Sequence, residues 1–314
     1  MHPAYSVILF TTTSGAGYGL LMWLAVTALT HDRTSDWRFA IASSAVALGL
    51  VTFGLVASMF HLGRPERAWR AFSEWRSSWL SREGIASLTT YVPALVFALL
   101  WSGLLPQTQW IAPAALAMLL MCVVTVYCTA RIYSSLITVR QWNHPLVEAA
   151  YLLWALATGS VLLTLLASVF GLNAPVLGRI AALSLIAAAL CKGFYWRAID
   201  ALAPAFTIEQ ATGLGRLGKV RQWEVPHTAE NFVMREMGYQ VARRHAARLR
   251  RYVLAATFLA AAFVLATGIA SGLLAVVFGT MGMISAAFAV LVERWLFFAE
   301  AQHVSILYYG APVA

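Results

Sequence analysis

Charged side chains are scarce in this chain, and they make up 11% of its 314 residues. A soluble domain of ordinary composition carries about a quarter of charged residues. Hydrophobic residues account for 61%, and the mean hydropathy is +0.73. The composition therefore excludes an ordinary soluble enzyme and indicates an integral membrane protein.

Cysteine is also scarce, with three residues, Cys122, Cys128 and Cys191, all in apolar stretches. None of them forms a C-x-x-C pair or a ferredoxin-like run, so the chain cannot hold an iron–sulfur cluster by itself. The C-x-x-C-H motif of covalently bound haem is missing too. We expect the three thiols to be small, buried hydrophobic side chains without disulfide bonds.

Long apolar runs are abundant, and eight of them are long enough to cross the roughly 30 Å hydrocarbon core of a bilayer. We expect an all-α bundle of eight transmembrane helices, forming one membrane domain over residues 1–314, without a cleavable signal. The spans are expected near residues 5–29, 39–60, 85–105, 111–130, 145–170, 180–196, 252–269 and 274–297. Only Ala270–Leu273 separates the last two, so Ser271-Gly272 is the expected turn of a helical hairpin.

The basic residues are distributed unevenly between the two sides that these spans define. Seventeen of the 22 lysines and arginines fall on the side that holds both termini and the loops after spans two, four and six. The positive-inside rule makes that side cytoplasmic, and the protein a multi-pass component of a bacterial cytoplasmic (inner) membrane. The net charge of +9 then reflects membrane topology, and no nucleic-acid partner is expected.

The largest segment outside the spans is the loop of residues 198–251, on the same cytoplasmic side. Residues 228–248 within it begin with a capping signal and continue as an amphipathic, arginine-rich helix. That helix lies on anionic lipid headgroups, docks a partner, or extends span seven as a basic juxtamembrane segment. The loop is too small for an independent catalytic domain.

The first span contains a run of small residues, Thr11–Gly19. Such a face lets helices approach closely, and it also leaves room for a flat ligand beside the backbone. The two interpretations are compatible, because small residues can border a ligand cleft.

A concentration of chemically useful side chains follows the second span. His61 stands at its end, a Gly63-Arg64-Pro65 turn and Arg67 follow, and Glu83 opens the third span. A histidine that titrates near neutral pH, fixed cations and a carboxylate suit a quinone, which exchanges protons together with its electrons. The alternative is that His61 only caps a helix at the interface and Glu83 only caps the start of the next helix.

Other polar residues in or near the spans allow two interpretations each. Arg131 and Tyr133 either border the same quinone cleft or anchor span four at the interface. Within spans, Glu293 and Arg294 can compensate each other's charge, and Lys192 can extend to the surface. A haem b is not expected, because no two histidines face each other at mid-membrane. His61 and His303 are the one pair that could share a haem near the surface.

Several segments resemble the membrane anchor subunits of the dimethyl sulfoxide reductase type, over essentially the whole chain. They are Ala57–Ala68 with His61-Leu62-Gly63, Ser78–Glu83, Arg131–Ser135 with Trp142, and Arg294–Phe298. The resemblance implies a complex used in anaerobic electron transport. A molybdopterin catalytic subunit and an iron–sulfur subunit with four [4Fe-4S] clusters would bind the cytoplasmic loops. The anchor would exchange electrons with ubiquinone or menaquinone at residues matching His61 and Glu83, and would hold no redox centre. Arg64 stands at a position where some members of the family have a small residue.

Within this family, Pro3–Ile8 and Glu230–Gly238 are most similar to the anchors of membrane-bound, cytoplasm-facing sulfite dehydrogenases. That similarity implies electron flow from sulfite to the quinone pool. A quinol-oxidising anchor of a sulfoxide reductase and a purely structural anchor are the alternatives. A transporter is disfavoured, because its charges would gather near the midplane and not at one face.

Overall fold

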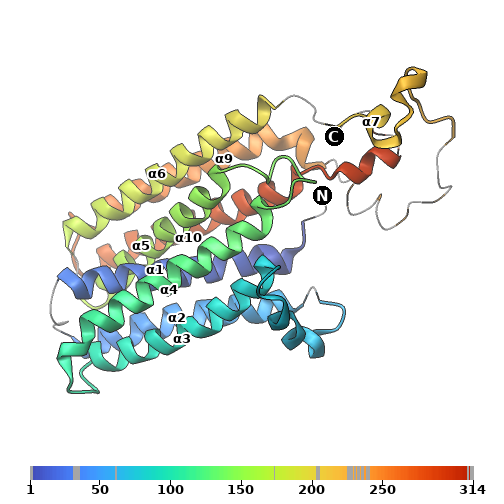
Figure 1. The fold of residues 1–314 in the computed structure, drawn as a ribbon. Coiled ribbons are helices and arrows are strands. Elements are labelled where there is room, and N and C mark those ends of the chain that lie inside the picture. Colours follow the sequence, from blue (N-terminus) through green and yellow to red (C-terminus); the bar gives the residue numbers. More distant parts are fainter. Residues whose placement is uncertain are drawn as a thin grey trace.

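The computed structural model describes residues 3–30, 36–60, 62–172, 174–202, 206–224 and 241–309, with Ala229, Asn231, Met234, Met237 and Ala311. Over these residues the fold is helical and contains no strand. Eight helices are long and apolar enough to cross a membrane. The predicted all-α, eight-helix membrane bundle is therefore confirmed (Figure 1).

The eight long helices alternate in direction through the bundle. They are α1 (Tyr5–Thr30), α2 (Trp37–Met59), α3 (Trp79–Trp101), α4 (Ile111–Ser134), α5 (Leu146–Val169), α6 (Pro175–Asp200), α9 (Val241–Ala266) and α10 (Gly272–Ala299). Shorter helices are α7 (Ile208–Thr212) and the 3₁₀ segments Pro65–Glu74, Thr108–Trp110, Leu214–Leu217 and Val304–Tyr309. The predicted amphipathic segment lies partly outside the described residues, and from Val241 onward it is the start of α9 itself.

One end of the bundle gathers the start of α1, the end of α10, the Pro65–Glu74 helix and α7 (Figure 1). The α4–α5 connection joins this end, because the backbone N–H of Val304 donates to the carbonyl oxygen of Thr138 at 3.2 Å. We call it the basic end, since the arginine-rich connections after α2, α4 and α6 lie there.

Helices α1 and α5 form the centre of the bundle. α1 packs against α2, α4, α5 and α10, and α5 packs against α1, α4, α6 and α10. α3 covers α4 on one side, and α9 lies against α6 and α10 on the other. Side chains of α1, α4, α5 and α10 can therefore meet inside the bundle.

Glycines bring α1 and α5 into backbone contact. A Cβ atom added at Gly19 would lie 1.7 Å from the carbonyl oxygen of Ala155, and one at Gly159 would lie 2.1 Å from the carbonyl carbon of Gly19. No other residue fits at either position, which confirms the close packing predicted for the small-residue face of span one.

The turn between α9 and α10 lies where the sequence predicted a hairpin. α10 begins at Gly272, whose φ of +56° strains any residue with a side chain, and Ser271 precedes it in extended conformation. The two helices pack against each other along their length.

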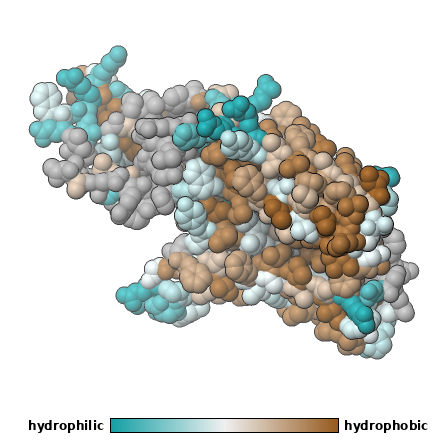
Figure 2. Space-filling model, turned by 180° about the vertical axis from the view of Figure 1, so that it is seen from behind, coloured by the Kyte–Doolittle hydropathy of each residue, from teal (hydrophilic) through white to brown (hydrophobic). Residues whose placement is uncertain are grey.

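The outer surface of the bundle is apolar. Figure 2 shows hydrophobic residues covering most of the helical body, while the hydrophilic groups gather at its margins. Large side chains such as Phe53 of α2, Val92 of α3 and Leu183 of α6 are exposed. A surface of this kind belongs in lipid, where the helices satisfy their own backbone hydrogen bonds.

Candidate functional site

The basic loop after α2 lies at the surface. His61 lies outside the described residues. Arg64 is 72% exposed and lies 3.8 Å from the Glu66 carboxylate. Arg67 belongs to the Pro65–Glu74 helix, which has no buried residue. The two arginines are therefore part of the outer face of the basic end and not of the bundle interior.

Glu83, in contrast, is buried between α3 and α4. It is the fifth residue of α3 and 4% exposed, and it accepts a 2.5 Å hydrogen bond from the Thr129 hydroxyl of α4. The cap of α3 is a different residue, Ser78, whose side chain accepts from the Ser81 N–H. Helix capping therefore does not explain Glu83, because its carboxylate points to another helix.

Arg131 and Tyr133 hold helices together at the same depth. The Arg131 guanidinium donates to the Glu148 carboxylate of α5 at 2.9 Å and lies over the Trp79 ring of α3. The Tyr133 ring is stacked on Tyr151 with centroids 5.9 Å apart. Neither residue lines the cavity described next, but Tyr133 positions Tyr151, which does.

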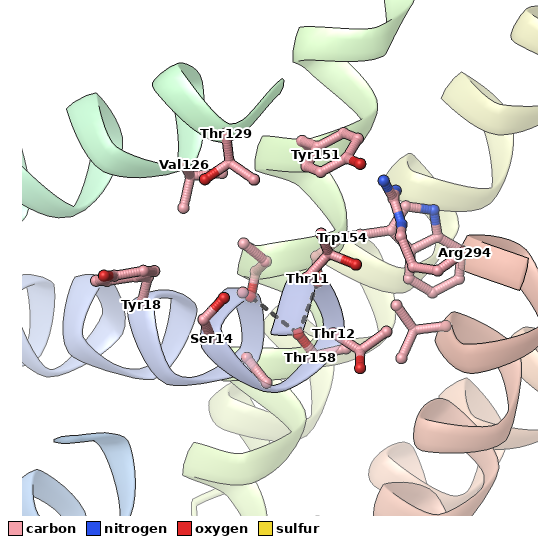
Figure 3. A pocket seen from close by; sticks show the side chains of 14 residues that line it. Thr11, Thr12, Ser14, Tyr18, Val126, Thr129, Tyr151, Trp154, Thr158 and Arg294 are labelled. Carbon is pink, nitrogen blue, oxygen red and sulfur yellow. Dashed lines mark hydrogen bonds between the residues drawn. The ribbon is translucent and has the colours of Figure 1, made fainter. Parts of the chain in front are cut away.

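A polar cavity lies between α1, α4, α5 and α10 (Figure 3). Its polar lining is Thr11, Thr12, Ser14 and Tyr18 of α1, Thr129 of α4, Tyr151, Trp154 and Thr158 of α5, and Arg294 of α10. About 20 Å³ of it is open to the centre of a water molecule, which is room for about one water. Because Thr129 borders the cavity and donates to Glu83, the carboxylate lies directly behind the cavity wall.

A buried cluster of charged side chains from α6 and α10 adjoins the cavity through Arg294. The Lys192 ammonium lies 2.6 Å from one Glu293 oxygen, and the Arg294 Nε lies 2.6 Å from the other. All three side chains are at most 2% exposed. The predicted compensation of Glu293 and Arg294 is confirmed, with Lys192 as a third member. The alternative that Lys192 extends to the surface is wrong, because its ammonium is fully enclosed and paired.

These groups form one layer near the basic end. Glu83 and Tyr151 are the fifth and sixth residues of their helices, and Thr129 and Arg294 are each five residues before the end of theirs. At 1.5 Å per residue this places them about 8 Å inside the helix ends. Ionisable groups at such depth are costly in a membrane and usually mark a functional pathway.

The two histidines at the loops are engaged by backbone. The Nδ1 atoms of His144 and His303 accept from the N–H groups of Leu146 and Ser305, at 3.2 and 3.1 Å. Burial lowers the pKa of both imidazoles below the usual value. Within the described ranges no group of three or more potential metal ligands comes together, and the haem pair of His61 and His303 lies partly outside those ranges.

Four polar side chains of the cavity, Thr129, Tyr151, Trp154 and Thr158, were not singled out from the sequence. Threonine and aromatic residues are common in membrane spans, so composition does not mark them. A usable signal is depth, because Thr129, Tyr151 and Trp154 lie within nine residues of the helix end at the basic end of the bundle, as Glu83 and Arg294 do.

The fold and this layer define a polytopic membrane protein with buried ionisable groups concentrated at one end. The chain belongs to the family of DMSO reductase anchor subunits (DmsC), whose family model matches residues 1–300. It is 34% identical to one of the subunits of the sulfite dehydrogenase of Allochromatium vinosum, over 98% of this chain and 99% of that protein. It is thus a membrane anchor subunit of a DMSO reductase-type or sulfite dehydrogenase complex.

Proposed function

We propose that this chain exchanges electrons between the membrane quinone pool and a sulfite-oxidising complex. Its similarity to one sulfite dehydrogenase subunit over nearly the full length of both chains supports the sulfite assignment. In this proposal, electrons from sulfite pass through partner subunits to ubiquinone or menaquinone. The matching family is that of DMSO reductase anchor subunits. The second candidate is therefore electron flow in the reverse direction, from quinol to a sulfoxide.

The partners belong to the proposal because this chain has no cluster-binding cysteine motif of its own. A molybdopterin catalytic subunit and an iron–sulfur subunit with four clusters would bind at the basic end, on the cytoplasmic side. Exposed tryptophans and arginines of the 60–78 connection, such as Trp69 and Arg67, offer a surface for such a partner. Electrons would then arrive next to the buried polar layer.

Glu83 is the observation that carries the proposal. Reduction of a quinone consumes two electrons and two protons, so the site needs a group that can hold a proton near the ring. A carboxyl side chain, buried in a membrane span and tied only to Thr129 among the described residues, suits that task. A purely structural anchor has no need for it.

The test compares Glu83→Gln with Glu66→Gln, an exposed carboxylate in the adjacent loop. In membranes containing the whole complex, Glu83→Gln should lower sulfite-dependent reduction of a ubiquinone analogue by about 10²-fold or more, the usual contribution of a positioned proton-transfer group. Sulfite oxidation with a soluble electron acceptor should remain unchanged, and Glu66→Gln should alter neither activity. Normal quinone reduction in an assembled Glu83→Gln complex contradicts the proposed role and favours a purely structural anchor.

A further inference from the structure

Five hydrogen-bond donor atoms on side chains that line the cavity make no hydrogen bond within the described part of the chain. They are Nη1 and Nη2 of Arg294, Nε1 of Trp154 and the hydroxyls of Tyr151 and Tyr18. The Arg294 guanidinium also lies over the Tyr151 ring, 3.9 Å from its centroid. All four residues are more than nine-tenths buried. Buried polar groups in proteins are almost always hydrogen-bonded. The donors of Arg294, Trp154 and Tyr151, gathered on one side of the cavity, therefore indicate a ligand that presents hydrogen-bond acceptors (Figure 3).

The wall on the α1 side of the cavity presents hydrogen-bond acceptors. The hydroxyls of Thr11, Thr12 and Ser14 donate to carbonyl oxygens of their own helix, at 2.9, 2.8 and 2.6 Å. Because their protons are used, these oxygens present lone pairs to the cavity. A ligand oxygen can thus accept from one wall as a carbonyl and donate to the other as a hydroxyl.

An apolar cleft adjoins the polar cavity. It has a volume of about 180 Å³ and lies between α1, α2, α5 and α10. The cleft and the cavity share four lining residues, Thr12, Ala16, Thr158 and Val290, so they lie on either side of the same side chains. Leu9 and Leu291, on the other rim of the cleft, are exposed on the lipid-facing surface.

The charged cluster makes the donor wall electropositive. Lys192, Glu293 and Arg294, when ionised, carry one net positive charge among them. That charge favours an oxygen atom that gains electron density on reduction. A phospholipid headgroup does not fit, because the polar cavity has room for about one water molecule.

We infer that the cavity and the cleft together bind an isoprenoid quinone inside the bundle. One ring oxygen lies against Arg294, Trp154 and Tyr151, the ring lies at the shared residues, and the tail leaves through the cleft into the lipid. The quinone enters sideways from the bilayer, and not from the loop surface. This inference rests on the proposed function, and it assigns the residues that bind the head and the tail.

The tail assignment is tested by filling the cleft. Ala287→Phe adds a ring at a half-buried cleft position, and Ala117→Phe is the control on the exposed face of α4. The complex with Ala287→Phe should show a KM for a long-tailed ubiquinone raised by about tenfold, the size expected when a few methylene contacts are lost. The KM for a short-tailed ubiquinone should change less than about twofold on the same reasoning. Equal effects on both ubiquinones, or none, overturn the tail assignment.

The head assignment is tested by removing one donor and keeping an aromatic ring. Trp154→Phe deletes the indole N–H, and Trp101→Phe makes the same change at a buried tryptophan near the opposite end of the bundle. Quinone binding should weaken about tenfold in Trp154→Phe, as for one lost hydrogen bond, with no change in Trp101→Phe. Equal affinities in the two variants contradict the head assignment.

A binding readout separates this inference from the proposed function. A radiolabelled azidoquinone, photolysed with the resting complex without sulfite, should label peptides of α1, α5 and α10. Labelling confined to the 60–78 connection overturns the inference and returns the site to the surface loop. Absence of sulfite-driven quinone reduction in the wild type contradicts the proposed function alone, because the photolabel still decides where quinone binds.

Discussion

At the scale of single residues, Thr129 connects two features of the site. Its hydroxyl donates to Glu83 and borders the cavity. Thr129→Val should leave the Glu83 carboxyl without this partner, which costs about 1–3 kcal/mol. We expect a lower melting temperature of the purified complex and slower quinone reduction. Thr129→Ser keeps the hydroxyl and should keep both properties; similar losses in Val and Ser variants contradict the role of the hydrogen bond.

The buried charged cluster allows a second prediction, about stability. Glu293→Gln leaves two enclosed cations, Lys192 and Arg294, without a counter-charge and should destabilise the anchor by about 3–5 kcal/mol. Lys192→Met leaves Glu293 paired with Arg294, so its effect should be smaller. Melting temperatures of the assembled variants measure both effects. A larger loss in Lys192→Met than in Glu293→Gln shows that the cluster is not held together by Glu293.

Residue-level prediction from the sequence was uneven for physical reasons. Glu83, Lys192, Glu293 and Arg294 are conspicuous in the sequence because ionisable side chains are rare in apolar spans. The convergence of Trp154 with Arg294 depends on which helices pack together, and no local pattern carries that information. The sequence analysis placed Arg64 and Arg67 in one site with Glu83 because the three are close in sequence. In the structure the two arginines are exposed and the Glu83 carboxylate is buried.

At the scale of helices, the α1–α5 contact sets the width of the cavity. Gly159→Ala places a Cβ atom against the backbone of Gly19, so the helices must separate or strain. The cost should be about 1–3 kcal/mol, as for other overpacked cores. Gly49→Ala on α2 is the control, since nothing lies within 4 Å of its added Cβ atom. A melting temperature of Gly159→Ala at or above that of Gly49→Ala contradicts the tight contact.

The helices themselves were largely predictable, since a bilayer of fixed thickness demands long apolar runs. The small residues of span one predicted a close contact, and Ser271-Gly272 predicted the α9–α10 turn. The partner helix in that contact was not predictable, because several spans offer small residues. The central position of α1 and α5 is a property of the packed bundle.

At the scale of the whole molecule, the asymmetry of basic residues predicts orientation in the membrane. A green fluorescent protein fused to the C-terminus should be fluorescent, because the positive-inside rule makes that side cytoplasmic. Alkaline phosphatase inserted between α1 and α2, on the opposite side, should be active. The reverse pattern contradicts the proposed cytoplasmic docking of partner subunits.

The most direct measurement is sulfite-dependent reduction of a ubiquinone analogue by membranes containing the complete complex. The wild type is compared with Glu83→Gln and with His61→Ala, the histidine that the sequence pairs with that carboxylate. We predict rapid reduction by the wild type and its loss in both variants, with all subunits still assembled. A wild-type complex that oxidises sulfite with a soluble acceptor but never reduces quinone contradicts the account.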